Sequence, residues 1–94
     1  MKAQHASEVI SFQDIPNIGP KMAADFLKLG LKDPQDLKTQ DAFQLYSEIC
    51  RLTGKRHDSC VLDTYMAAID FMNGASACPW YDYTAQRKHL YPDI

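Results

Sequence analysis

One stretch of the chain has the residue types needed to hold a phosphate group through its backbone. It reads Ile15-Pro16-Asn17-Ile18-Gly19-Pro20-Lys21 and leads directly into a helical pattern. Amide N–H groups at the start of a helix are unpaired and carry the positive end of its dipole, and glycine lets an anion approach them closely. We therefore expect unusual backbone angles at Gly19. We also expect Gly19 and Lys21, with Ile18 next to them, to hold a phosphate without reading the bases. The alternative is that Gly19-Pro20 only turns the chain between two core helices.

A second segment concentrates positive charge in a chain whose net charge is -2. The run Lys55-Arg56-His57 follows Gly54, and Arg51 lies four residues before Lys55. A second phosphate contact is predicted here. Its residues are Gly54, Lys55 and Arg56, with Arg51 and Lys28 adding charge. The alternative is that these basic side chains complement the dipole at a helix C-terminus.

Other chemistries find little support in the sequence. His57 and Cys60 supply two metal ligands, whereas a structural zinc site needs four, and the remaining His and Cys residues lie on unrelated segments. As a catalytic dyad, His57 and Cys60 lack a clear orienting third group. The chain contains none of the motifs GxxxxGK[ST], HExxH and GxSxG. We predict no enzyme activity, no metal and no cofactor.

The elements that position these residues are predicted to be helices. Proline and aspartate at helix starts and glycine at helix ends delimit them. The expected ranges are 21–29, 34–38, 42–53 and 59–72, with a further short helix over about 7–12. Asp33, Asp41 and Asp58 are the expected N-caps. Period-2 alternation is nearly absent, so no strands are expected.

The last twenty residues lack a helical stripe and contain Pro79 and Pro92. We expect residues 75–94 to form a non-helical strap packed over the core through its aromatic side chains. These are Trp80, Tyr81, Tyr83 and Tyr91. The alternative is a free binding peptide.

Length and composition limit the fold and the partners. Ninety-four residues with 46% hydrophobic content fit a single domain over 1–94. The three cysteines form no CxxC pair, so no disulfide framework is expected. No apolar run approaches the roughly 20 residues that cross a bilayer, and no signal-peptide core is visible. We predict a cytoplasmic protein without membrane contact, and only weak, salt-sensitive DNA binding.

Three segments together resemble a bacterial family. They are Ile15–Pro20, the run Leu52-Thr53-Gly54-x-Arg56-His57-Asp58-x-Cys60-Val61-Leu62-Asp63, and Pro79-Trp80-Tyr81-Asp82-Tyr83. Over residues 10–84 the chain is similar to the pathogenicity-locus helix-hairpin-helix family, some members of which are labelled mitomycin-resistance protein-like. The resemblance implies a compact, all-α, five-helix bundle of two helix-hairpin-helix units (SAM-like). It supplies no catalytic residues.

The resemblance also carries Ile18, Gly19 and Lys21 over as hairpin residues. Asn17 stands where the family's hairpin usually has its first glycine. Because asparagine tolerates left-handed backbone angles, we expect the turn to close in spite of this departure.

The function predicted from these observations is a non-enzymatic, sequence-independent DNA-binding module. It would hold backbone phosphates through hairpin amides and basic side chains. The alternative is a protein–protein interaction domain that uses the hairpin face or the aromatic tail.

Overall fold

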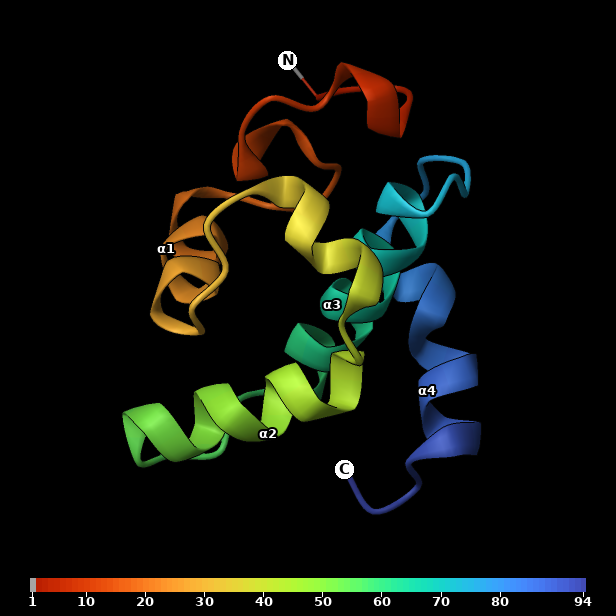
Figure 1. Cartoon of the computed structure of the whole chain (residues 1–94). Helices are drawn as coiled ribbons and strands as arrows, with labels where there is room; N and C mark the ends of the chain where they lie inside the picture. The colour runs from red at the N-terminus through yellow and green to blue at the C-terminus, as the bar shows by residue number, and fades with distance from the viewer. Residues whose placement is uncertain (1) are drawn as a thin grey trace.

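The computed structural model describes residues 2–94 and consists of helices joined by short turns (Figure 1). The α-helices are α1 (Pro20–Lys28), α2 (Ala42–Thr53), α3 (Ser59–Met72) and α4 (Thr84–Leu90). The 3₁₀ helices are η1 (Ala6–Glu8), η2 (Phe12–Asp14), η3 (Pro34–Thr39) and η4 (Trp80–Tyr83). Residues 2–94 contain no strand, so the all-α prediction is confirmed.

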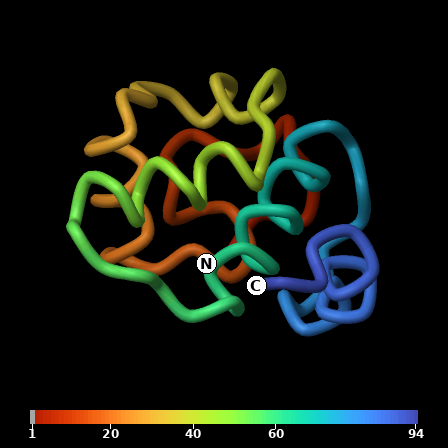
Figure 2. Tube along the Cα trace, turned by 90° about the horizontal axis from the view of Figure 1, so that it is seen from below, coloured from red at the N-terminus to blue at the C-terminus, as the bar shows by residue number. Residues whose placement is uncertain are grey.

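Helix α3 is the centre of the fold. Its residues from Leu62 to Ile69 are all buried, as are Phe71 and Met72. The elements that pack on it are α2, α4, η3 and η4. In Figure 1 α3 lies between α1 and α2 on one side and α4 on the other, and Figure 2 shows α4 and the α1 side at opposite edges of the molecule. A helix enclosed in this way must be apolar on most of its circumference, which its sequence satisfies.

The expected helix caps are present. The carboxylates of Asp33, Asp41 and Asp58 each accept a hydrogen bond from a backbone amide two or three residues further on, at 2.9, 2.9 and 3.5 Å. Each replaces a bond that the first turn of its helix cannot make internally. The predicted starts of η3, α2 and α3 are therefore confirmed.

The prediction of a non-helical segment over residues 75–94 is wrong. Helices η4 and α4 occupy most of it. The one buried residue of α4 is Arg87, whose Nε donates to Asp63 Oδ1 of α3 at 2.8 Å, and Thr84 Oγ1 donates to Asp63 Oδ2 at 2.8 Å. A search for an apolar stripe misses α4 because its inner face is anchored by a buried ion pair rather than by aliphatic side chains.

The expected helix over residues 7–12 is also wrong, since two separate 3₁₀ turns, η1 and η2, occupy this region. The carboxylate of Glu8 accepts from the amides of residues 4 and 5, and the carboxylate of Asp14 from those of residues 10 and 11. Each carboxylate closes a single turn, and Val9 between them has extended backbone angles. These backbone donors lower the pKa of both carboxylates.

None of the helices within residues 2–94 combines the length and the apolar composition required to cross a membrane.

Candidate functional site

The segment before α1, residues 15–19, is called the α1 entry turn. Its unusual backbone angle lies at Asn17, with φ 72°, and not at Gly19, where φ is -95°. The expectation for Gly19 is therefore wrong, and the expectation that Asn17 adopts a left-handed conformation is confirmed. The Asn17 side chain donates from Nδ2 to the carbonyl of Cys78 at 2.9 Å. This hydrogen bond ties the entry turn to the C-terminal segment.

The start of α1 presents unpaired amides. Gly19 is the N-cap and has no capping side chain, and Pro20 occupies the first helical position without an N–H group. The amides of Gly19, Lys21 and Met22 donate to no acceptor within residues 2–94, whereas the amide of Ala23 is the first to bond, to the Gly19 carbonyl at 3.0 Å. These three donors lie at the positive end of the α1 dipole.

The space above Gly19 is open. A β-carbon built on Gly19 would meet no atom within 4 Å apart from those of its chain neighbours, so no more distant part of residues 2–94 fills this side of Gly19. Ile18, in contrast, is fully buried and donates its amide to the Ile15 carbonyl at 3.2 Å. Ile18 therefore anchors the turn in the core, while Gly19 and Lys21 face outward.

Cations flank the entry turn. The Lys2 ammonium donates to the carbonyls of Gln13, at 2.6 Å, and of Ile18. Lys21 is exposed and has no ion-pair partner within residues 2–94. Lys28 is also exposed, but it follows Lys21 by seven residues and so lies about 10 Å further along the helix. Sequence reasoning missed Lys2, because its contact depends on the folded path of the N-terminal segment.

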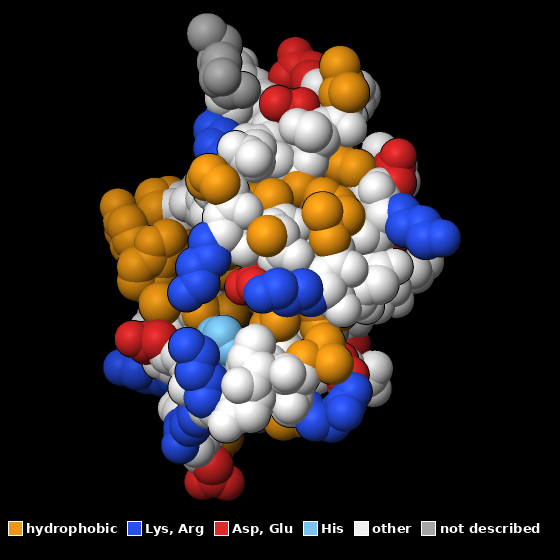
Figure 3. All heavy atoms as spheres, turned by 90° about the vertical axis from the view of Figure 1, so that its left-hand side faces the viewer, with side chains coloured by type: hydrophobic (Ala, Val, Ile, Leu, Met, Phe, Trp, Pro, Cys, Tyr) orange, Lys and Arg blue, Asp and Glu red, His pale blue; other side chains and the backbone are white. Residues whose placement is uncertain are grey.

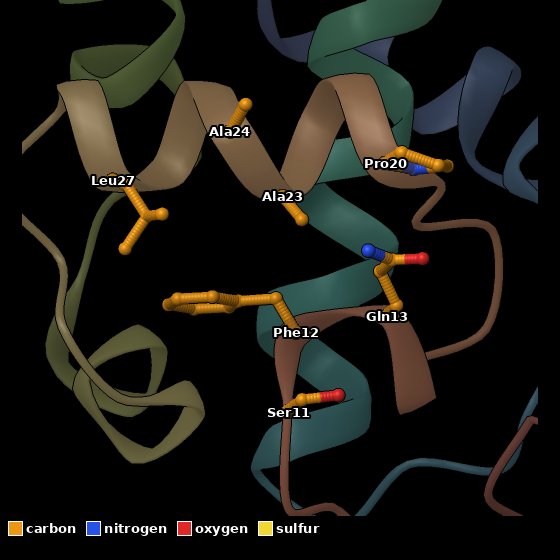
Figure 4. A pocket seen from close by; sticks show the side chains of 7 residues that line it. All are labelled: Ser11, Phe12, Gln13, Pro20, Ala23, Ala24 and Leu27. Carbon is orange, nitrogen blue, oxygen red and sulfur yellow. The ribbon is translucent and has the colours of Figure 1, made fainter.

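A hollow of about 270 Å³ lies beside the entry turn, between η2 and α1. In Figure 4 the side chains of Ala23 and Leu27 point from α1 toward Phe12, and Gln13 extends toward the same helix. The lining contains no charged side chain. The hollow is thus suited to an apolar group and not to a phosphate.

The α2–α3 turn, residues 54–58, differs from the entry turn in its backbone. Gly54 has φ 68° and donates its amide to the Arg51 carbonyl at 3.3 Å, and the Lys55 amide donates to the Cys50 carbonyl at 3.2 Å. Both amides therefore satisfy the carbonyls at the end of α2. The expectation that Gly54 and Lys55 present free amides to a phosphate is wrong. Asp58 also places a carboxylate at the start of α3.

What the α2–α3 turn offers is side-chain charge. Lys55 and Arg56 are exposed and form no ion pair within residues 2–94. Arg51 is paired with Glu48, its Nε donating to Glu48 Oε2 at 3.1 Å, so its charge is largely neutralised. This pairing lowers the pKa of Glu48 and raises that of Arg51.

Basic side chains are visible on the face of the molecule that carries α1 and one end of α2 (Figure 3). Figure 3 views the side on which Figure 1 shows α1 and the end of α2, and Lys and Arg side chains gather over the middle and lower part of this face. A histidine lies among the lower ones, and acidic side chains lie between and beside them. Exposed basic side chains are thus present on this face although the net charge of the chain is -2.

The His57 side chain forms a hydrogen bond within the segment that joins α2 to α3. The Thr53 hydroxyl donates to the Ile49 carbonyl at 2.8 Å, which leaves it to accept from His57 Nε2 at 2.9 Å. Burial raises the pKa of the Cys60 thiol, and the nearby carboxylates of Asp58 and Asp63 raise it further, so the thiol is protonated at neutral pH. No group of three metal-ligating side chains is found in residues 2–94.

Comparison with known proteins identifies relatives of the chain. Residues 5–89 match the family Cdd1, described as a pathogenicity locus. Over 74 residues the chain is 38% identical to the mitomycin resistance protein McrB of Streptomyces lavendulae, an alignment that covers 79% of this chain and 70% of the relative. No solved structure matches the chain significantly.

Proposed function

The chain belongs to the pathogenicity-locus family Cdd1, and we propose that it is a non-enzymatic domain that binds the phosphate backbone of DNA without reading its sequence. The observation that carries the proposal is the start of α1, where three amides find no acceptor in the described part of the chain, the Cβ side of Gly19 is open and Lys21 is exposed. The name of the Streptomyces relative concerns mitomycin resistance and does not itself indicate DNA binding.

The entry turn would hold one phosphate. A phosphate oxygen accepts from the amides of Gly19 and Lys21, and the Lys21 ammonium adds a charge that no carboxylate of residues 2–94 pairs with. Such contacts fix the position of the backbone and carry no sequence information.

Lys55 and Arg56 would supply a second, purely electrostatic contact from the α2–α3 turn. With one amide cradle and a few side-chain charges, the affinity should fall in the non-specific range of about 10⁻⁴ to 10⁻⁶ M at physiological salt. No group in this interface is arranged to activate a nucleophile, and the proposal requires no reaction.

The experiment is fluorescence anisotropy of a labelled duplex over a series of salt concentrations. We expect the logarithm of the affinity to fall with the logarithm of salt concentration with a slope of about -0.9 for each phosphate contacted. Lys21→Glu should weaken binding at least about tenfold, because it replaces a favourable charge with a repulsive one. Lys88→Glu, an equal charge change on exposed α4, is the matched control. A flat salt dependence, or equal losses from the two variants, would contradict the proposal.

The second candidate is a protein partner that docks at the hollow between η2 and α1. It is favoured by the exposure of Ile10 (87%) and Leu27 (59%), two apolar side chains that lie on or next to this part of the surface. Leu27→Asp would abolish docking of a protein at the hollow. The same substitution would weaken DNA binding only about twofold, by adding one exposed negative charge near Lys28.

A further inference from the structure

An exposed aromatic pair lies in η4. The rings of Trp80 and Tyr81 meet edge to face, with centroids 5.6 Å apart and an interplanar angle of 85°. Trp80 is 37% exposed and Tyr81 61% exposed, whereas Tyr83 of the same short helix packs against the core. Helix η4 itself packs on α3, so a firm support holds two aromatic surfaces toward solvent.

The aromatic pair is tethered to the α1 entry turn. The hydrogen bond from Asn17 Nδ2 to the Cys78 carbonyl joins the two segments at 2.9 Å. Gly19 follows Asn17 by two residues, and Trp80 follows Cys78 by two residues. Each of these links spans at most about 7 Å. The segments that carry the aromatic pair and the unpaired amides at the start of α1 are therefore joined, within two residues of each, by this hydrogen bond.

We propose that Trp80 and Tyr81 stack on unpaired bases, and that the DNA this domain prefers is single-stranded. The inference rests on the proposed function, because the phosphate of the same strand is held at Gly19 and Lys21. A base in a duplex is already stacked on its neighbours and offers no free face, whereas a base in a single strand does. Aromatic platforms beside a cationic backbone contact are the usual means of binding single strands without sequence preference.

The charges around the aromatic pair favour a nucleic acid over an apolar peptide. Lys2 and Lys21 flank the entry turn, and the unpaired amides beside them are donors that suit an anionic partner. The carboxylate that η4 itself contributes is Asp82, which is exposed. Its repulsion of a phosphate is consistent with modest affinity, and Asp82→Asn should tighten single-strand binding about twofold.

The test uses the intrinsic fluorescence of Trp80, the single tryptophan of the chain. The protein is titrated with an oligothymidylate and, separately, with a duplex of the same length. We expect the single strand to quench Trp80 emission in a saturable manner and to bind more tightly than the duplex. Emission unchanged at saturating single strand, with binding followed independently by anisotropy, would overturn the inference.

Substitutions extend the test to both rings. Trp80→Ala and Tyr81→Ala should each lower affinity for the labelled single strand at least about fivefold, the lower end of the range for one base–aromatic stack. Affinity for the duplex should change less than twofold. Trp80→Phe is the matched control, because it keeps a ring and should retain most of the single-strand affinity. Circular dichroism and thermal melting verify folding, and Tyr81→Ala, at the more exposed ring, serves if Trp80→Ala does not fold.

The outcomes separate this inference from the proposed function. Equal affinity for the two DNA forms, or equal losses on both from Trp80→Ala and Tyr81→Ala, contradicts stacking and leaves phosphate binding intact. Absence of binding to either form at low salt removes the phosphate contact, and the stacking proposal with it.

Discussion

The α1 entry turn and the α2–α3 turn look alike in sequence and differ in what their backbones offer. Each contains a glycine between two helices, and each is followed or surrounded by basic residues. In the entry turn the glycine begins a helix and its amide is unpaired. In the α2–α3 turn the glycine ends a helix, and its amide is taken up by a carbonyl of α2. Of these two glycines, therefore, it is the one at the start of a helix that leaves its amide without an acceptor in residues 2–94.

The two turns also differ in the residue that caps the following helix. Gly19 caps α1 with its backbone alone, whereas Asp58 caps α3 with a carboxylate. A carboxylate at a helix N-terminus already complements the dipole and repels a second anion. Within residues 2–94, the entry turn therefore combines unpaired amides with a lysine outside any ion pair, whereas the α2–α3 turn places a carboxylate at the start of its helix.

The largest effect should come from the glycine at the end of α2. Gly54→Ala places a side chain in a left-handed conformation and should lower the free energy of unfolding by about 1–2 kcal/mol. Urea denaturation measures this loss. DNA affinity of the folded variant should change less than twofold, and a larger change would mean that Gly54 contacts the DNA.

Gly19→Ala should show the reverse pattern. The φ of -95° and the open space allow a methyl group, so the loss of unfolding free energy should be small, about 0.5 kcal/mol from the poorer N-cap. The added methyl group obstructs the approach to the free amides, and DNA affinity should fall about tenfold if one charge-assisted hydrogen bond is lost. Anisotropy and urea denaturation on the same samples test the contrast. Unchanged affinity would argue against the amide contact.

Removing the charge of Asp58 should make the α2–α3 turn resemble the α1 entry turn, which has no carboxylate at its helix cap. Asparagine also caps helices, so Asp58→Asn should preserve most of the stability. Loss of the negative charge at the start of α3 should tighten DNA binding about two- to fivefold at low salt. The gain should vanish near 1 M salt, where charges are screened within about 3 Å. Weaker binding of D58N would show that phosphates do not approach this turn.

The smallest effect concerns pH and the segment that supports the entry turn. The amides of Ser11 and Ile10 lower the pKa of Asp14 below its ordinary value of 3.8. Stability from this group is complete above the unfolded-state pKa and is lost as the pH falls through the folded-state pKa. Denaturation curves at pH 6 and pH 3 should therefore differ less for Asp14→Asn than for the unmodified protein. An identical difference would show that Asp14 contributes nothing to the acid sensitivity.

The sequence predicts the bounds of those helices whose start and end are set by neighbouring residues. Asp41 and Gly54 delimit α2, and Asp58 begins α3, because caps and left-handed glycines act within one turn of the chain. Helix α4 was not predictable from a stripe, since the residue that it buries is Arg87 and the partner, Asp63, lies 24 residues away.

In the candidate site, too, the features set by local sequence were predictable and those that depend on distant contacts were not. The tolerance of Asn17 for a left-handed conformation follows from its residue type and was predicted. The pairing of the Gly54 and Lys55 amides depends on how α2 ends, and the contact of Lys2 with the Ile18 carbonyl depends on the folded N-terminal path. Neither of these two contacts can be predicted from the spacing of residue types in the sequence.

The hydrogen bond between Asn17 and Cys78 also bears on when the proposed binding surface is completed. Its two residues are 61 positions apart. Because a chain is made from its N-terminus, the entry turn emerges from the ribosome before its acceptor carbonyl exists. The contact between the entry turn and the C-terminal segment therefore forms only near the end of synthesis, so a nascent chain that lacks Cys78 does not carry it.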